Sequence, residues 1–172
     1  MACLISAVAN GGTLFSPVYL EKITGSDGRI VKSFESDPRS NLPISESNLG
    51  MIKRALVGAV NDEKGTGSRC KLPDVLVAGK TGTAQVIEQD AHRQDKNIQW
   101  KHRDHAWFIA YAPAERPELA VAVLCEHSGH GGSVAAPIAR EIFKTWFKTR
   151  SPLPLLGPRN TALNINGIDD HA

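Results

Sequence analysis

A lysine, two threonines and two glycines lie together in one short stretch of this 172-residue sequence, Ala78-Gly79-Lys80-Thr81-Gly82-Thr83-Ala84. The residues around it are rich in β-branched side chains, which predicts a strand. Side chains alternate along a strand, so Lys80 and Gly82 would share one face, and Thr81 and Thr83 the other. Glycine weakens a strand, and one physical reason to keep it is that something approaches the backbone closely. The stretch could therefore present a cation and two hydroxyls to an extended ligand.

An ordinary edge strand or a phosphate-binding loop could also account for this stretch. The strand, predicted over residues 74–87, could lie at a sheet edge with a solvated lysine, and for an isolated Lys-Thr-Gly that would be the better interpretation. A phosphate-binding loop also ends in Gly-Lys-Thr, but it needs a glycine where Asp74 stands and a helix after the threonine. The sequence provides neither, so we exclude that loop.

Metal binding is the other chemistry that the sequence could support. Cys125, His127 and His130 have a Cys-x-His-x-x-His spacing, but His130 lies in a glycine turn, and a structural zinc needs four converging ligands. Three further histidines lie in or near the long polar segment 88–104: His92, His102 and His105. We therefore expect no metal site, and no motif in the sequence requires a cofactor.

The composition sets broad limits on function. Hydrophobic residues make up 41% and charged residues 22% of the chain, which is ordinary for a soluble globular protein. A net charge of +2, without a basic run interleaved with aromatic residues, gives no support to nucleic-acid binding. No apolar run is long enough to cross a bilayer. Cys3, Cys70 and Cys125 are odd in number and unrelated in spacing, so they define no disulfide framework.

The segments before the Lys80 strand predict two helices and a hairpin. An apolar helix over 1–9 ends at Asn10-Gly11-Gly12, and residues 13–23 and 29–34 form a hairpin around a turn at 24–28. Residues 38–43 are predicted to be a polar linker. A second helix follows, with Ser45 as its N-cap and four apolar residues at helical spacing: Leu49, Ile52, Leu56 and Val60. A loop over 61–68 then leads to the Lys80 strand.

The segments after the Lys80 strand predict an antiparallel meander and a final helix. Strands over 105–112 and 119–126 follow the polar segment 88–104, and the apolar character of the last strand is typical of the interior of a sheet. A helix from Ser133 to Phe147, capped by Ser133, would lay one apolar stripe on the sheet: Val134, Ile138, Ile142 and Trp146, with Ala139 and Phe143 beside them. We expect an α+β domain over 1–150, an antiparallel sheet flanked by helices, and a flexible tail over 151–172.

The order of several motifs resembles the C-terminal part of the transpeptidase domain of a class B penicillin-binding protein, of the penicillin-binding protein 2 type. The resemblance covers roughly residues 1–148. Its motifs are Ala9-Asn10-Gly11-Gly12-Thr13, Ala78-Gly79-Lys80-Thr81-Gly82-Thr83-Ala84-Gln85, Asp104-His105-Ala106-Trp107-Phe108-Ile109-Ala110-Tyr111-Ala112-Pro113, Ala120-Val121-Ala122-Val123 and Glu126-His127-Ser128-Gly129-His130-Gly131-Gly132-Ser133. The ordered series makes the resemblance specific, more than the Lys-Thr-Gly alone.

The resemblance implies roles for four residues of the lysine-bearing strand. A partial β-lactamase/transpeptidase-like fold would cross-link cell-wall peptides by acyl transfer from a D-Ala-D-Ala stem peptide, and β-lactams would occupy the same place. Lys80 would supply a cation for proton transfer, and Thr83 a hydroxyl for the terminal carboxylate and a backbone N–H for the oxyanion. Lys80 and Thr83 are thus the expected catalytic residues, and Thr81, Gly82 and Thr83 the expected substrate-binding residues.

The sequence departs from the family in its nucleophile. The family uses a serine in a Ser-x-x-Lys box and a second Ser-x-Asn box, and no serine here is followed by Asn two residues on. Ser68-Arg69-Cys70-Lys71 matches the first box literally, but it lies in a glycine-rich loop, whereas the box should open a helix. We therefore expect Ser68 not to be the nucleophile and this chain alone to be inactive.

Further expectations concern the longer protein from which the chain, with its uncapped first helix, would be cut. It would lie at the periplasmic face of the inner membrane, held by an anchor outside this chain, and would work with proteins of the cell-elongation machinery. The fragment would lack the N-terminal strands and the nucleophile helix, so the strand at 119–126 would be an edge prone to self-association. The alternative to an enzyme is a non-catalytic domain of the same fold that binds peptide or a cell-wall synthesis partner.

Overall fold

A three-stranded antiparallel sheet forms the centre of the molecule. The computed structural model describes residues 1–87 and 99–149 of the chain. Strands β5 (Ala78–Ala84), β6 (His105–Ala112) and β7 (Leu119–Cys125) pair in the order β5-β6-β7, with Lys80 opposite Ile109 and Phe108 opposite Val123. Each strand pairs with the one before it in the sequence, so the predicted meander and the α+β class are confirmed.

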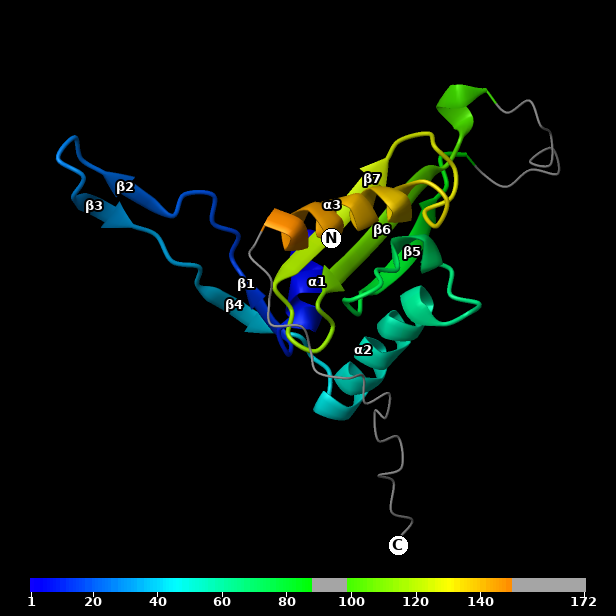
Figure 1. Ribbon diagram of the computed structural model, residues 1–172, viewed down its shortest axis with the longest axis horizontal. Coiled ribbons are helices and arrows are strands. Elements are labelled where there is room, and N and C mark those ends of the chain that lie inside the picture. The colour runs from blue at the N-terminus through cyan, green and yellow to red at the C-terminus, as the bar shows by residue number, and fades with distance from the viewer. Residues whose placement is uncertain (88–98, 150–172) are drawn as a thin grey trace, which may run out of the picture.

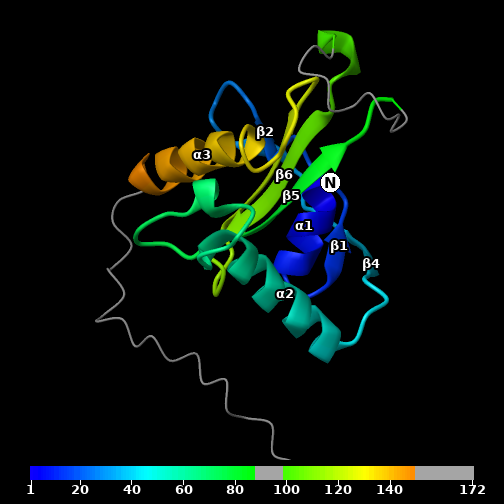
Figure 2. The same cartoon turned by 90° about the vertical axis from the view of Figure 1, so that its right-hand side faces the viewer.

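Helices cover both faces of this sheet. Helices α1 (Ala2–Ala9) and α2 (Glu46–Asn61) lie on one face, and α3 (Ala135–Thr149) lies on the other, as Figures 1 and 2 show. Because side chains alternate along each strand, the sheet supplies two separate cores. The first packs Ala78 and Tyr111 against α1 and α2, and the second packs Phe108, Val121 and Val123 against α3.

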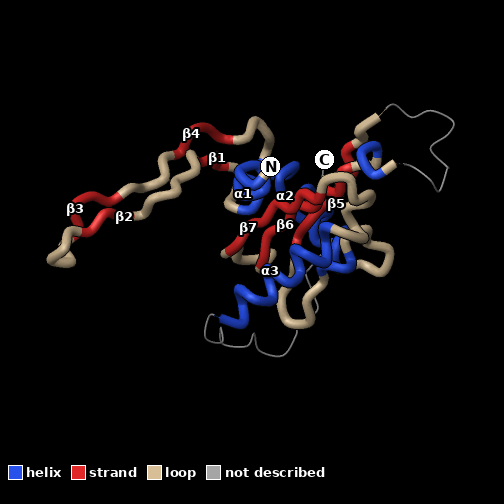
Figure 3. The backbone as a smooth tube through the Cα atoms, turned by 90° about the horizontal axis from the view of Figure 1, so that it is seen from above, coloured by secondary structure: helices blue, strands red, loops and turns tan. Residues whose placement is uncertain are grey.

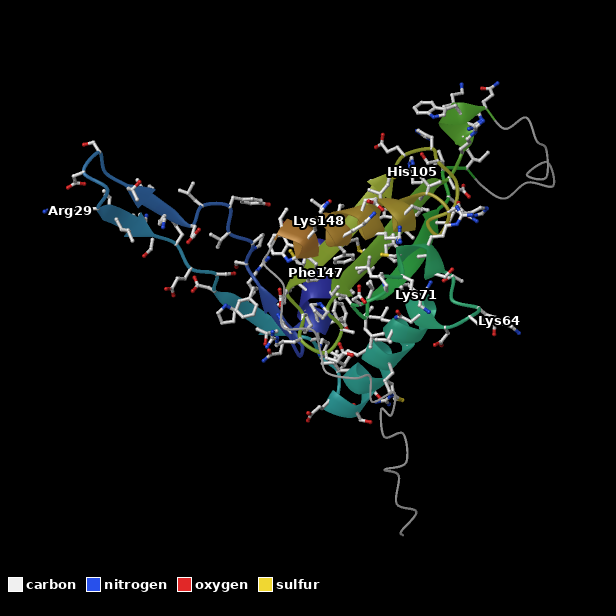
Figure 4. All side chains as sticks on the ribbon, viewed as in Figure 1. Arg29, Lys64, Lys71, His105, Phe147 and Lys148 are labelled. Carbon is white, nitrogen blue, oxygen red and sulfur yellow. The ribbon has the colours of Figure 1, made fainter. Side chains whose placement is uncertain are left out.

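The N-terminal hairpin is longer than the sequence predicted and projects from the body of the protein. Strands β2 (Lys22–Thr24) and β3 (Ile30–Ser33) form its tip, while β1 (Thr13–Phe15) and β4 (Pro38–Asn41) form its base. The arm is clear in Figure 3, and Figure 4 places Arg29 at its tip. The prediction of a polar linker over 38–43 was wrong, because residues 38–41 form strand β4, which pairs with β1. The strand is polar because all four of its residues are exposed to solvent.

The predicted start of α2 is correct, and that of α3 is not. The hydroxyl oxygen of Ser45 accepts a hydrogen bond from the Asn48 amide at 3.3 Å, as an N-cap does. By contrast, α3 begins at Ala135, and the Ser133 hydroxyl donates to the His130 carbonyl at 3.0 Å. Ser133 therefore closes the preceding glycine turn instead of capping the helix.

The face of α3 that packs on the sheet includes Ala139 and Phe143 of the predicted stripe, but it is turned away from the isoleucines at the centre of that stripe. Its buried residues are Ala135, Ala136, Ala139 and Phe143, whereas Ile138 and Ile142 are 44% and 41% exposed. Periodicity alone centred the stripe on the isoleucines, but small alanines let the helix approach the sheet closely, so close packing decided the orientation. The exposed stripe, with Leu119 and Pro137, lines an open apolar groove of about 810 Å³.

The lysine-bearing strand and the last strand have clear limits. The predicted strand over 74–87 shortens to Ala78–Ala84, while β7 ends one residue before the predicted Glu126. Among the described residues β7 pairs with β6 alone, and its side chains alternate between buried Val121 and Val123 and exposed Ala122 and Leu124. In the part of the chain that the structure describes, no helix has the length and apolarity needed to span a membrane.

The tail predicted over 151–172 lies outside the described residues.

We predict that the chain self-associates through the outer edge of β7, because an apolar strand edge is a template for another strand. Leu124→Lys should reduce the association, since Leu124 is 44% exposed and a charge there opposes edge pairing. Size-exclusion chromatography with light scattering would compare it with the wild type and with Met51→Lys, which alters an exposed apolar side chain of α2. A monodisperse wild-type monomer would contradict the prediction.

A second prediction concerns Cys70, whose side chain is fully buried. Burial raises the pKa of its thiol from 9.0 to about 12, against the opposing effect of the Arg140 cation. Above pH 9 the thiol therefore ionises in the unfolded chain but not in the folded one, so the free energy of unfolding should fall between pH 9 and 12. Urea unfolding across this range should show a smaller fall for Cys70→Ala. The exposed-thiol variant Cys3→Ala should follow the wild type, and identical slopes for all three proteins would refute the assignment.

Candidate active site

Lys80 and Thr83 lie exposed on β5, at a free edge of the described sheet. Lys80 stands opposite Ile109 and shares its face with Ala78, which α1 and α2 cover, so Lys80 follows directly after the covered part of that face. Its Nζ donates a hydrogen bond to the Thr81 carbonyl at 2.8 Å. The ammonium group is therefore held near its own strand while it remains open to solvent.

Thr81 lies on the opposite face of the strand and is only partly exposed. It stands opposite Phe108, and its hydroxyl donates to the hydroxyl oxygen of Thr66 at 3.1 Å. Thr66 comes from the loop after α2, which the sequence predicted only as a connection to β5. A signal was present, because Thr66 lies between Gly65 and Gly67, and glycines that flank a polar residue often mark a backbone that must fold tightly.

Packing within the protein helps to explain why β5 contains two glycines. A Cβ atom at Gly79 would lie 2.8 Å from Phe108 Cζ and 2.9 Å from Ala110 Cβ, so the core itself excludes a side chain there. At Gly82 the nearest atom would be Trp107 Cβ at 3.2 Å, a tight contact that a neighbour could relieve by a small shift. At Gly79 it is therefore the protein's own core that approaches the backbone closely. At Gly82 the neighbouring atoms leave more room, so the approach of a ligand can still explain why this residue is a glycine.

A second glycine-rich segment packs against the same part of β5. A Cβ atom at buried Gly131 would clash with the carbonyl oxygens of Trp107 and Gly82, and one at Gly132 would clash with that of Thr66. The turn at 131–132 therefore lies directly on the ends of β5 and β6. Together with the Thr66 loop, it surrounds Thr81 from two sides.

The residues before this turn form an aromatic and histidine cluster. The His127 amide donates to His105 Nδ1 at 2.9 Å, and His127 has a positive φ of 51°. The His127 ring lies 4.5 Å from the Trp100 ring and 4.6 Å from the His105 ring, measured between centroids. Figure 4 labels His105, the first residue of β6, at one end of the sheet. These contacts anchor the turn that reaches Gly131.

The histidines do not assemble a metal site in the part of the chain that is described. No group of three possible ligands converges among those residues, and His92 lies outside them. His127 follows the end of β7 in a turn, so it does not share a strand face with Cys125. The absence of a metal site therefore stays a prediction from the sequence.

The position of Ser68 does not suit a nucleophile of the Ser-x-x-Lys type, which should open an α-helix. It opens η1, a single 3-10 turn over Ser68–Cys70, and Lys71 follows the turn. Lys71 Nζ donates to the Asn61 carbonyl at 3.0 Å, at the end of α2, instead of stacking over Ser68. The site that the described residues form is thus one wall, with a cation, hydroxyls and an open strand edge that can accept an extended peptide.

Comparison with known proteins shows which family the chain resembles. Residues 1–144 match the family model of the penicillin-binding protein transpeptidase domain. The chain is 32% identical over 166 residues to the peptidoglycan D,D-transpeptidase MrdA of Acinetobacter baumannii, which covers 95% of this chain and 24% of that protein. It is 34% identical over 158 residues to the stage V sporulation protein D of Bacillus subtilis, covering 89% of this chain and 22% of that protein.

Solved structures agree with the sequence relatives. The D,D-transpeptidase domain of a peptidoglycan glycosyltransferase from Eggerthella lenta matches with a TM-score of 0.69 and 27% identity, covering 87% of this chain and 31% of that one. The penicillin G acyl-enzyme complex of penicillin-binding protein A from Mycobacterium tuberculosis matches with a TM-score of 0.66 and 30% identity, covering 85% and 31%.

These matches cover nearly all of the described fold but only part of each relative. The chain spans about a quarter of the length of the curated relatives. The relatives named MrdA and PbpA confirm the resemblance to the class B, penicillin-binding protein 2 type. The chain therefore belongs to the penicillin-binding protein transpeptidase family.

Proposed function

We propose that this chain forms the Lys-Thr-Gly wall of a peptidoglycan D,D-transpeptidase, which β-lactams would acylate. The observation that carries the proposal is the exposed pair Lys80 and Thr83 on the free edge of β5, in a chain of this family. Relatives bear the name peptidoglycan D,D-transpeptidase, and a structural neighbour forms acyl-enzyme complexes with penicillin G and imipenem. The serine nucleophile would come from a part of the protein outside these 172 residues.

The proposed reaction gives separate roles to four residues of β5. The D-Ala-D-Ala end of a stem peptide lies extended along the edge of β5, and Gly82 leaves room for it. The serine attacks the penultimate carbonyl, and the Thr83 N–H is one of two donors that hold the resulting oxyanion. The Thr81 and Thr83 hydroxyls bind the substrate, Thr83 at its terminal carboxylate. The positive charge of the Lys80 ammonium favours negatively charged groups in the site and assists proton transfer to the departing D-Ala amine. An acceptor amine then takes the acyl group from the serine.

The position of Ser68 gives some weight to a second function. Since Ser68 and Lys71 do not form a nucleophile box, a protein without a nucleophile elsewhere would be a non-catalytic domain. Such a domain would bind a peptide or a cell-wall synthesis partner at the same edge. In either case we place the whole protein at the periplasmic face of the inner membrane, with the cell-elongation machinery as its partners.

The proposal predicts that the chain alone forms no covalent adduct with penicillin. Lys80 has no suitably placed serine to activate, because Ser68 lies in a 3-10 turn whose lysine bonds elsewhere. The isolated chain would be incubated with a fluorescent penicillin and analysed by denaturing electrophoresis and mass spectrometry. A stoichiometric adduct on Ser68, or on any other residue of the chain, would overturn the view that it carries a partial site.

In the full-length protein, Lys80→Ala should lower the second-order rate constant of acylation by penicillin by roughly 100-fold, since it removes an electrostatic stabiliser of the transition state. Thr83→Ala removes a substrate contact and should lower it by a smaller factor. The matched control is Lys64→Ala, an exposed lysine in the loop after α2 that Figure 4 places at the outside of the molecule. An unchanged rate constant for Lys80→Ala would eliminate the proposed role of this lysine.

A further inference from the structure

We propose that Thr66 is a positioning residue of the same site: it orients the Thr81 hydroxyl toward the acyl donor. This inference rests on the proposed function, because Thr81 must be a substrate contact for its orientation to affect acylation. The contact that carries it is the 3.1 Å hydrogen bond between the two hydroxyls. Thr66 precedes Thr81 by fifteen residues, so only the folding of the loop between α2 and β5 brings them together.

The backbone of the Thr66 loop is fixed by its two glycines. The Gly67 amide donates to the Ala59 carbonyl at 2.8 Å, which folds the loop back onto the last turn of α2. A Cβ atom at Gly65 would lie 2.6 Å from the Ala59 oxygen, and one at Gly67 would lie 3.0 Å from Phe108 Cε2. Larger residues at either position would push the loop outward. Thr66 is therefore presented to β5 by a tightly constrained backbone.

The glycine turn at 131–132 holds the other side of the pair. A Cβ atom at Gly132 would clash with the Thr66 carbonyl oxygen and would lie 3.4 Å from Thr81 Cγ2. The turn thus contacts both threonines, and its own position is set by its packing on Gly82 and Trp107. With backbone on both sides, Thr66 and Thr81 have little freedom to separate without a movement of the turn.

The hydrogen-bonding capacity of a hydroxyl shows how Thr66 can act through Thr81. Each hydroxyl has one proton to donate and lone pairs to accept. In the free site the Thr81 proton points to Thr66. When a carboxylate or carbonyl of the acyl donor arrives, the Thr81 proton turns to it, and the Thr66 hydroxyl turns to donate to the Thr81 oxygen. The bond between the threonines is kept with its direction reversed, and the chain of two hydroxyls strengthens the donor that faces the substrate.

A purely structural role predicts a different pattern from a positioning role. The Thr66–Thr81 bond is exposed, and a single exposed hydrogen bond contributes little net stability. Thr66→Val, which keeps the shape and removes the hydroxyl, should therefore leave the melting temperature of the full-length protein nearly unchanged. Its effect should appear in acylation, where the Thr81 hydroxyl would lose its partner and its fixed rotamer.

The test measures the second-order rate constant of acylation by penicillin G for a set of full-length variants. We expect Thr66→Val to lower it about tenfold, as the loss of one hydrogen bond in the transition state would. Thr66→Ser, which restores the hydroxyl, should acylate nearly as fast as the wild type. In a Thr81→Val background, Thr66→Val should have no further effect, because its partner hydroxyl is absent. The control is Thr13→Val, which removes a similar exposed bond, from Thr13 Oγ1 to Asn41 Oδ1 at 3.2 Å, on the projecting arm.

Two results would overturn the inference while the proposed function stands. One is a Thr66→Val protein that acylates like the wild type, although Lys80→Ala is impaired. The other is a Thr66→Val effect of equal size with and without the Thr81 hydroxyl, since Thr66 would then act independently of it. A full-length wild type that penicillin G does not acylate, or a Lys80→Ala variant as fast as the wild type, would count against the proposed function itself and remove the basis of this inference.

Discussion

The packing of one aromatic ring constrains both the sheet and the candidate site. Phe108 is fully buried in the core beneath α3, and its ring lies against two positions that have no side chain, Gly79 and Gly67. Gly79 belongs to β5, and Gly67 belongs to the loop that carries Thr66. The ring therefore sets the distance between that loop and the strand. Interiors pack like organic crystals, so this distance cannot change without loss of contact around the ring.

Because of this constraint, strand β5 combines a rigidly packed first part with exposed polar side chains in its second part. The first residues of β5, Ala78 and Gly79, are buried, whereas Lys80 and Thr83 are exposed. The buried part fixes the register with β6, and the following residues inherit a defined position from it. A reactive group on a regular strand is held more accurately than one on a loop. The strand thus belongs to the core at one end and to the candidate site at the other.

The sequence predicted the features that depend on local signals. The meander, the end of α1 at Asn10-Gly11-Gly12 and the Ser45 cap are each determined by a few neighbouring residues, and the structure has them all. The exact orientation of α3 and the pairing of β4 could not be predicted, because both are decided by distant partners. Thr66 was missed for the same reason: its neighbour Thr81 is near only after the loop folds back onto α2. The Gly-Thr-Gly pattern marked the loop as constrained without indicating what it contacts.

The two edges of the described sheet differ in chemistry, and the difference indicates what each can accept. The β5 edge carries a lysine and glycines, which discourage pairing with another long apolar strand. Such an edge stays open to water and suits a short, polar, extended ligand. The β7 edge has the sequence Leu119-Ala120-Val121-Ala122-Val123-Leu124-Cys125, with neither charge nor proline. An apolar edge of this composition is a template for another strand, so we propose that the sheet accepts a substrate on one side and further protein on the other.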